Sequence, residues 1–122
     1  MGIASVLFEE VYQILEKIVD EQYEALGREG KLIGVSEEEI REILARYGAP
    51  TRVPVRRLVD DFAYRQLRQT NFYKGYLNLW LDGERSGLYL VCAIGLDGQG
   101  RVVYSAIDEI HVTRKAPETA LR

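Results

Sequence analysis

The sequence has 122 residues, 47% of them hydrophobic, and a formal net charge of -3, which predicts one globular domain with a modest core. Acidic and basic residues are mixed along the chain, so we expect no nucleic-acid partner, because such a partner requires a basic surface. The single cysteine, Cys92, excludes an intramolecular disulfide. The sequence has no signal peptide and no membrane-spanning run, so we expect a cytoplasmic protein that makes no membrane contact.

One local cluster of arginines leaves a polyanion open as a ligand. The cluster could contact nucleic acid, but its neighbours Asp60 and Asp61 favour a solvated surface instead. Its members are Arg52, Arg56, Arg57, Arg65 and Arg68.

The N-terminal segment has helical periodicity. Apolar residues recur every three or four positions with acidic residues between them, which predicts a helix from Ser5 to about Leu26. We expect Ser5 to cap its N-terminus and Gly27 to end it.

A capping-box pattern marks the next helix. Ser36 can accept a hydrogen bond from the Glu39 amide, and the Glu39 side chain can reach back, which predicts a helix running to about Tyr47. Gly48 ends this helix, and a proline follows two residues later.

The segment from Pro54 to Phe72 contains a short third helix and an ambiguous stretch. Pro54 suits a first helical turn, and the apolar residues after it mark the helix. Residues 64–72 could extend this helix or form an edge strand, and the pattern favours the strand.

From Tyr73 to Val112 the alternation of side chains predicts an antiparallel meander. Asp-Gly at the second turn is a strong hairpin signal. Pairing Leu81 with Leu88, and Leu96 with Arg101, brings aliphatic residues together in both hairpins, including Leu77 with Cys92 and Ile94 with Val103. The expected strands are 73–81, 88–94 and about 101–112, joined by turns at 82–87 and 97–100.

Both hairpins sort the side chains onto the same two faces. The leucine face contains Leu77, Leu79 and Leu81 and continues into the next strand. The second face is too apolar for a solvated surface, so either a helix or a partner covers it. This aromatic face consists of Tyr76, Trp80, Tyr89, Val91, Val102 and Tyr104.

These elements predict an α+β fold, with two or three N-terminal helices packed on a three- to four-stranded antiparallel meander. We expect a single domain over residues 1–113 and a flexible tail at 114–122.

Short motifs spread over most of the chain form an ordered set. They are Glu21-x-Tyr23-Glu-Ala-Leu26, a serine-led helix ending at Tyr47-Gly48 before a proline, Leu79-Trp80, Gly83-Glu-Arg-Ser86, a Leu-x-Leu strand and Ile107-Asp108-x-Ile110-His111-Val112. The set resembles a widespread family of small uncharacterised bacterial domains, whose members carry Leu-Trp, then Gly-Arg-Ser-Asp-Leu, and end on Ile-x-x-Ile-His-Val. Gly87 departs from that pattern, which has aspartate there. The resemblance implies no established activity, and immunity-type binding proteins are an analogy only.

Candidate catalytic groups are few. His111 is the only histidine, and beside Asp108 and Glu109 it could act as a general acid or base. It has no serine, cysteine or carboxylate partner at a recognisable spacing, so we interpret it as a structural or surface residue. We expect Cys92 to be a small core residue. These groups cannot form a zinc site, so we expect no metal and no cofactor.

Two functions remain open. The favoured one is a non-enzymatic interaction domain that binds a protein, or forms a homodimer, through the aromatic face. The alternative is a small-molecule-binding or hydrolytic domain with a pocket near Trp80, Arg85 and His111. In that alternative the turn at Arg85 and Ser86 binds an anion, whereas the simpler interpretation is that Ser86 bonds its own backbone. The predicted binding residues are Tyr76, Trp80, Arg85, Tyr89 and Tyr104.

Overall fold

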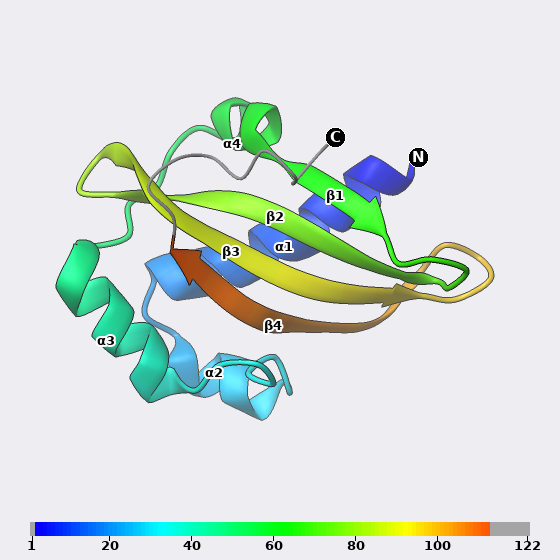
Figure 1. Cartoon of the computed structure of the whole chain (residues 1–122), viewed down its shortest axis with the longest axis horizontal. Helices are drawn as coiled ribbons and strands as arrows, with labels where there is room; N and C mark the ends of the chain where they lie inside the picture. The colour runs from blue at the N-terminus through cyan, green and yellow to red at the C-terminus, as the bar shows by residue number, and fades with distance from the viewer. Residues whose placement is uncertain (1, 113–122) are drawn as a thin grey trace.

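The computed structural model describes residues 2–112, and over that range four helices precede one antiparallel sheet of four strands (Figure 1). The strands pair in the order β1-β2-β3-β4, so the sheet is a meander and the predicted α+β class is confirmed. The predicted tail at 114–122 lies outside the described residues. The helices are α1 (Ile3–Val19), α2 (Tyr23–Arg28), α3 (Glu37–Tyr47) and α4 (Val55–Asp61), and the strands are β1 (Ala63–Gln66), β2 (Phe72–Leu81), β3 (Glu84–Leu96) and β4 (Val102–Val112).

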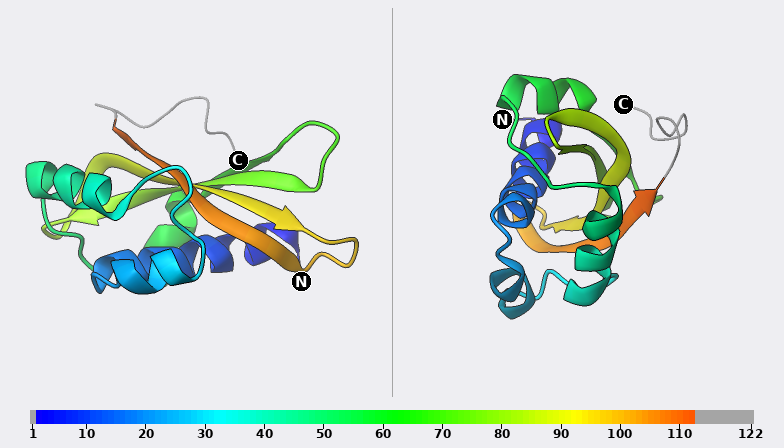
Figure 2. Two further views of the ribbon diagram at one scale, coloured as in Figure 1. Left: turned by 90° about the horizontal axis from the view of Figure 1, so that it is seen from below. Right: turned by 90° about the vertical axis from the view of Figure 1, so that its left-hand side faces the viewer.

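Helix α1 lies along one face of the sheet, and its apolar stripe forms the centre of the core (Figure 2). Leu7, Val11 and Ile18 of this helix are completely buried. A fully buried side chain of this size stabilises a fold by about 1.5–3 kcal/mol, so this contact contributes several kcal/mol to the stability of the domain. The sheet contributes the predicted leucine face, namely Leu77, Leu79, Leu81, Leu88, Leu90, Cys92 and Ile94, all of them buried.

The predicted first helix is in fact two helices, because the chain turns at Glu21. Glu21 has a left-handed backbone with a φ of 56°. Its amide donates to the Ile18 carbonyl at 3.1 Å, and the Gln22 amide donates to the Lys17 carbonyl at 2.8 Å, which together form a Schellman motif. The prediction of one helix to Leu26 is therefore wrong. Glycine or asparagine normally signals this turn, and glutamate gives no such signal.

Helix α2 also ends differently from the prediction. It continues through Gly27, the expected stop, and ends at Arg28. Gly30, with a φ of 72°, turns the chain, and the Lys31 amide donates to the Leu26 carbonyl at 2.9 Å. This is a second Schellman motif, with glycine at the left-handed position.

The predicted N-cap is correct for α3 and wrong for α1. In α3 the Ser36 hydroxyl accepts from the Glu39 amide at 3.1 Å, and the Glu39 carboxylate accepts from the Ser36 amide at 2.9 Å, which confirms the capping box. Helix α1, by contrast, begins at Ile3 with Gly2 as its N-cap, so the prediction of Ser5 as the cap is wrong. Over residues 2–112 no helix has the length and apolar character that crossing a membrane requires.

The segment between α3 and the meander agrees with the sequence. Gly48 ends α3 as predicted, and Pro54 precedes α4, whose Leu58 is buried. Residues 63–66 form β1, so the edge strand is confirmed over residues 64–66, whereas residues 67–71 form the turn into β2. Because β1 pairs only with β2, it is an edge strand of the sheet.

The β2–β3 hairpin turns on two residues, Asp82 and Gly83, whose φ values are 52° and 82°. Positive φ at both positions is characteristic of a type I′ turn, for which Asp-Gly is a preferred sequence. The longer turn predicted over 82–87 is therefore wrong. Leu81 pairs with Glu84 and not with Leu88.

Most of the other predicted pairings are displaced by an even number of residues, but β-bulges in β3–β4 displace some by an odd number, so that Leu96 pairs with Val102 and not with Arg101. Leu77 pairs with Leu90, and Ile94 pairs with Ser105, each two positions from the predicted neighbour. An even displacement keeps every side chain on its face, because strand side chains alternate with a period of two. The leucine face is thus assigned correctly in β2 and β3 even though its pairings are wrong. At the start of β4 the assignment is wrong, because Val103, the predicted partner of Ile94, is 65% exposed and Val102 packs against the core.

A β-bulge lies in β2 between Asn78 and Trp80. The buried Asn78 side chain donates to the carbonyls of Ser86 and Leu88 at 2.8 and 2.9 Å. The Ser86 hydroxyl donates to the Leu79 carbonyl at 2.7 Å and accepts from the Leu88 amide at 3.0 Å. These bonds replace the ladder bonds that the bulge disrupts, and they confirm the simpler interpretation of Ser86 as a residue that bonds local backbone.

The outer edge of β4 is covered by the segment that leads into α3. The Ile107 amide donates to the Lys31 carbonyl at 2.7 Å, and the Gly34 amide donates to the Ile107 carbonyl at 3.0 Å. This contact closes the edge at that point against further strand pairing. It also requires glycine at position 34, where a Cβ would lie 1.9 Å from the carbonyl oxygen of Asp108.

We expect Gly34→Ala to destabilise the domain by about 2 kcal/mol or more, because the added Cβ would overlap main-chain atoms of β4 that cannot move independently. The matched control is Gly98→Ala, since nothing lies within 4 Å of a Cβ built there. Urea unfolding measures the free energy of both variants. Equal effects would contradict the close approach of this loop to β4.

Candidate functional site

Trp80 and Arg85, two of the predicted binding residues, pair across the first hairpin. The guanidinium carbon of Arg85 lies 5.8 Å from the centroid of the Trp80 ring, and that of Arg57 in α4 lies 5.7 Å from it. Arg85 also donates to the mostly buried carboxylate of Asp61 at 2.5 Å. The indole therefore has two cation–π contacts, and one of the two cations is neutralised by an ion pair.

The other predicted binding residues do not join Trp80 in one surface. Tyr89 is only 9% exposed, so most of its ring is inaccessible from solvent. Tyr104 lies near the β3–β4 turn and is 39% exposed. The hydroxyl of Tyr76 accepts from the Arg65 side chain at 3.1 Å. The predicted aromatic face is thus divided into separate parts along the sheet.

His111 is separated from the other residues of the predicted pocket. It pairs across the sheet with Tyr89, whereas Trp80 pairs with Arg85 beyond the bulge. The His111 side chain is half-exposed, and its Nδ1 lies 3.6 Å from the Glu109 carboxylate. Asp108, the other predicted acidic neighbour, instead pairs with Lys74 at 2.8 Å. Within residues 2–112 no three histidine, cysteine or acidic side chains lie close enough to hold a metal.

The thiol of Cys92 is completely buried in the leucine face. Burial, followed by the nearby charge of Glu10, raises the pKa of this thiol well above its ordinary value. A nucleophilic cysteine needs a thiolate and access to substrate, and Cys92 has neither.

We expect the Cys92 thiol to react with a disulfide reagent only when the domain unfolds, because burial keeps it protonated and inaccessible. The measurement is the rate of labelling with Ellman's reagent at increasing urea, compared with unfolding followed by tryptophan fluorescence. Rapid labelling in the absence of urea would contradict this assignment.

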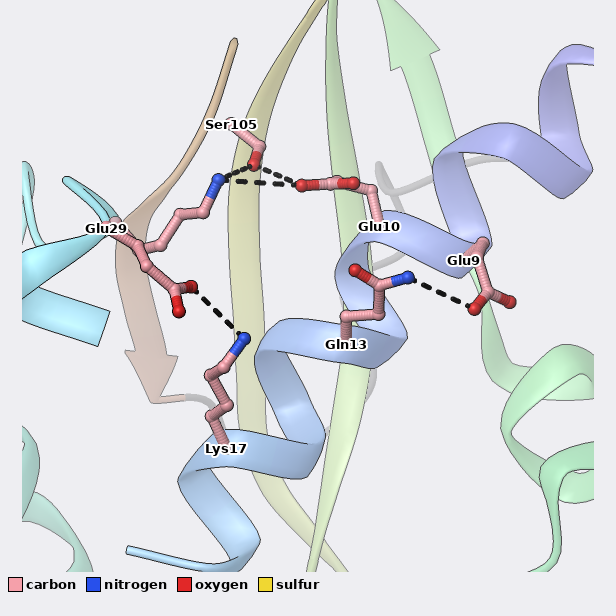
Figure 3. Close-up of polar contacts among 7 residues, drawn as sticks. Glu9, Glu10, Gln13, Lys17, Glu29 and Ser105 are labelled. Atoms are coloured by element: carbon pink, nitrogen blue, oxygen red, sulfur yellow. Dashed lines mark hydrogen bonds and ion pairs between the residues drawn. The ribbon is translucent and has the colours of Figure 1, made fainter. Parts of the chain in front are cut away.

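A buried polar network joins α1 to β4 (Figure 3). The Ser105 hydroxyl donates to the Glu10 carboxylate at 2.5 Å, and the Lys31 ammonium donates to the same hydroxyl at 2.7 Å. A serine beside a lysine and a carboxylate has the composition of an activated nucleophile. However, Ser105 is only 4% exposed, so a substrate cannot reach its hydroxyl. We interpret the network as a structural link between the helices and the last strand.

We expect Glu10 and Lys31 to be coupled by about 1 kcal/mol in a double-mutant cycle of Glu10→Gln and Lys31→Met, because both side chains are mostly buried. The matched control is the exposed pair Glu24 and Arg28, for which the cycle should give only about 0.3 kcal/mol. Urea unfolding of the single and double variants gives both values. A coupling no larger than in the control would contradict the structural role of the network.

A hollow of about 530 Å³ lies near the C-terminal end of α3. Arg41 stacks over the Tyr23 ring at 4.7 Å and donates to Glu37 at 2.8 Å. Burial, followed by the charge of Glu21, raises the pKa of the Tyr23 hydroxyl. The cation of this hollow is therefore already satisfied within the chain, which makes the hollow a weak candidate for a ligand site.

The strongest candidate is a groove of about 660 Å³ between the first turns of α1, helix α4 and strand β1. Its apolar rim is exposed: Val55 and Val59 are 44% and 51% accessible. A row of ring contacts runs through it, with centroids 5.5–6.0 Å apart. The rings that line the groove are Phe8, Phe62 and Tyr64, and Tyr12 stacks on Phe8 outside the lining. The remaining lining residues are Ala4, Ser5 and Glu9.

The groove is not predicted by the sequence, in which the apolar residues after Pro54 mark only a short helix. Only Leu58 of this helix is buried, and Val55 and Val59 point away from the core. Positions 55, 58, 59 and 62 have the i, i+3, i+4, i+7 spacing of one helix face, so the local pattern does not show which of these side chains stay exposed.

Residues 15–113 match the family model of a domain of unknown function, DUF7668. The chain belongs to this family. No curated protein and no solved structure gives a significant match to this chain. In this DUF7668 domain the matched region begins inside α1, so Ala4, Ser5 and Phe8 precede it, whereas α4 and β1 lie within it.

Proposed function

We propose that this DUF7668 domain is a non-enzymatic protein-interaction domain whose main contact surface is the groove between α1, α4 and β1. The observation that carries the proposal is the exposure of Val55 and Val59 beside a row of aromatic rings. Contiguous apolar surface of this kind is costly to leave in water and usually marks an interface. Aromatic side chains also dominate the binding energy of interfaces.

The groove is better supported as a contact surface than the aromatic face of the sheet. Tyr89 and Val91, at the middle of that face, are 9% and 2% exposed. The groove, in contrast, has both accessible apolar rims and a concave floor. The partner is either another protein or a second copy of the chain, and both agree with the function expected from the sequence.

The non-enzymatic part of the proposal rests on the state of the reactive groups. Ser105 and Cys92 are buried, and His111 has an acidic neighbour but no nucleophile beside it. None of these groups lines the groove.

The alternative function, binding of a small molecule near Trp80 and Arg85, has one specific observation in its favour. Nε1 of Trp80 and Oδ2 of Asp61 are buried and have no hydrogen-bond partner in the described part of the chain. Buried polar atoms are normally paired, so a water or ligand that both accepts and donates would fit there. The protein-interaction proposal remains the better supported, because apolar side chains on the rim of the groove are exposed.

The proposal predicts that a photo-crosslinking amino acid at position 59 captures a protein in cells that express the full chain, because Val59 lies on the exposed rim of the groove. The same amino acid at position 103 is the matched control, since Val103 is an exposed valine of β4, 65% accessible and outside the groove lining. Gel shift and mass spectrometry identify the adducts.

The adduct at position 59 should disappear when Val55→Glu places a charge on the same rim. Equal adducts at both positions, or none at position 59, would count against the groove as the contact surface.

A further inference from the structure

The groove lies beside β1, and the hydrogen-bond ladder shows which main-chain groups of that strand point outward. In an antiparallel pair, residues bonded to the neighbouring strand alternate with residues whose N–H and C=O point away from it. The Leu67 amide donates to the Phe72 carbonyl at 2.8 Å, in register with the β1–β2 pairs. If Leu67 bonds to β2, then Arg65 and Ala63 bond to it as well. The main-chain groups of Tyr64 and Gln66 therefore point away from β2.

The other side of β2 gives the same assignment. The Leu96 amide donates to the Asn71 carbonyl at 3.0 Å, so the odd-numbered residues of β2 bond to β3. The even-numbered residues remain for β1, and Lys74 therefore bonds to Arg65. No hydrogen bond from residues 2–112 reaches the outward main-chain groups of Tyr64 and Gln66.

The side chains of β1 point alternately into the groove and away from it. Tyr64 stacks on Phe62 at 6.0 Å and pairs with Gly75, where an added Cβ would meet Val11 of α1, so Tyr64 faces the helix side. Arg65 faces the opposite side, where it donates to the Tyr76 hydroxyl. A strand added to this edge would therefore direct every second side chain toward the groove and the others toward Arg65.

The two edges of the sheet differ in whether their outward main-chain groups are already hydrogen-bonded. On β4 the main chain of Ile107 is already bonded to Lys31 and Gly34. On β1 no hydrogen bond from the described part of the chain reaches the outward groups, which lie beside exposed apolar surface. Strand addition combines main-chain hydrogen bonds with pockets for alternate side chains, and β1 offers both.

We propose that β1 and the groove together bind an extended segment of another protein as an added strand, with apolar residues at alternate positions and an acidic residue between them. The apolar residues occupy the groove beside Val59 and Tyr64. The acidic residue pairs with Arg65, which is exposed and has no carboxylate partner among the described residues. This inference rests on the proposed function and names the chemistry of its partner.

A second copy of the chain fits this edge less well. Antiparallel pairing of two β1 strands satisfies all the open groups only when Tyr64 of each copy faces Gln66 of the other. That register places the two Arg65 residues opposite each other as a non-bonded pair, with Cα atoms about 4.5 Å apart. Like charges directly opposite destabilise a strand pair, so the occupant is a segment of a different protein.

The test uses a short synthetic peptide of alternating valine and threonine, with one central glutamate at a threonine position. Binding to the full chain is followed by fluorescence anisotropy and by amide hydrogen exchange in NMR spectra. The amides of Tyr64 and Gln66 should exchange rapidly in the free protein and at least about tenfold more slowly with the peptide. The Arg65 amide, which is already bonded to Lys74, is the internal control and should not change.

Matched peptides and variants separate strand addition from simple apolar contact. N-methylation of the peptide amides that face β1 should weaken binding at least about tenfold, because it removes main-chain hydrogen bonds. Val59→Glu should weaken binding by a similar factor, and Val103→Glu should not. Arg65→Glu should weaken binding of the glutamate peptide about threefold and strengthen binding of a lysine peptide by the same factor.

Several outcomes would overturn the inference. They are no binding of the peptide, equal binding of the N-methylated peptide, unchanged exchange of the Tyr64 and Gln66 amides, or concentration-dependent protection of these amides without peptide, which would indicate self-pairing. If any of these results is found but position 59 still crosslinks to a protein, strand addition is wrong and the groove remains the proposed contact surface. Absence of crosslinking at position 59 would instead count against the groove itself.

Discussion

The burial of one helix stripe against one sheet face is the interaction on which the rest of the domain depends. Leu7, Val11 and Ile18 of α1 cover the leucine face, and each such side chain stabilises the fold by about 1.5–3 kcal/mol. The ion pairs around α1, such as Arg52 with Glu16, are partly exposed and contribute at most about 1 kcal/mol each. Their role is to position neighbouring segments on a helix that hydrophobic burial already holds in place.

Some surface groups are already paired within the chain, and others are not. Arg85, Arg41 and Lys31 all have acidic partners, so their charges are balanced before any ligand arrives. The groove has only apolar rims and rings, and its one charged lining residue is Glu9. The groove exposes apolar surface, and the neighbouring strand edge exposes main-chain groups that can still form hydrogen bonds. A polypeptide can satisfy both, whereas a small ion cannot.

The sequence was sufficient for the fold wherever a local signal has one physical meaning. The capping box at Ser36, the stop at Gly48 and the alternation of the leucine face each have one structural solution, and the structure contains them. It was insufficient where a residue adopts a conformation its type rarely favours. Glu21 has a left-handed backbone although it is not glycine, so the sequence does not indicate the break between α1 and α2.

The register and the candidate site required information that the local pattern does not contain. A shift of two residues leaves side chains on the same face, so alternation cannot distinguish the predicted pairing of Leu77 from the observed one. The outward direction of Val55 and Val59 depends on how α4 meets α1 and β1, which is a tertiary constraint. The Asp82-Gly83 turn, in contrast, was visible in the sequence and was underweighted.

The network between α1 and β4 has a consequence for how the protein is made. Glu10 and Ser105 are 95 residues apart in the chain, so the first helix meets one of its partners only after nearly the whole sequence has been synthesised. Contacts of such long range are slow to form, because loop closure must precede any energetic gain. Until β4 leaves the ribosome, the apolar stripe of α1 lacks part of its cover, and the nascent chain is then most exposed to chaperones and to aggregation.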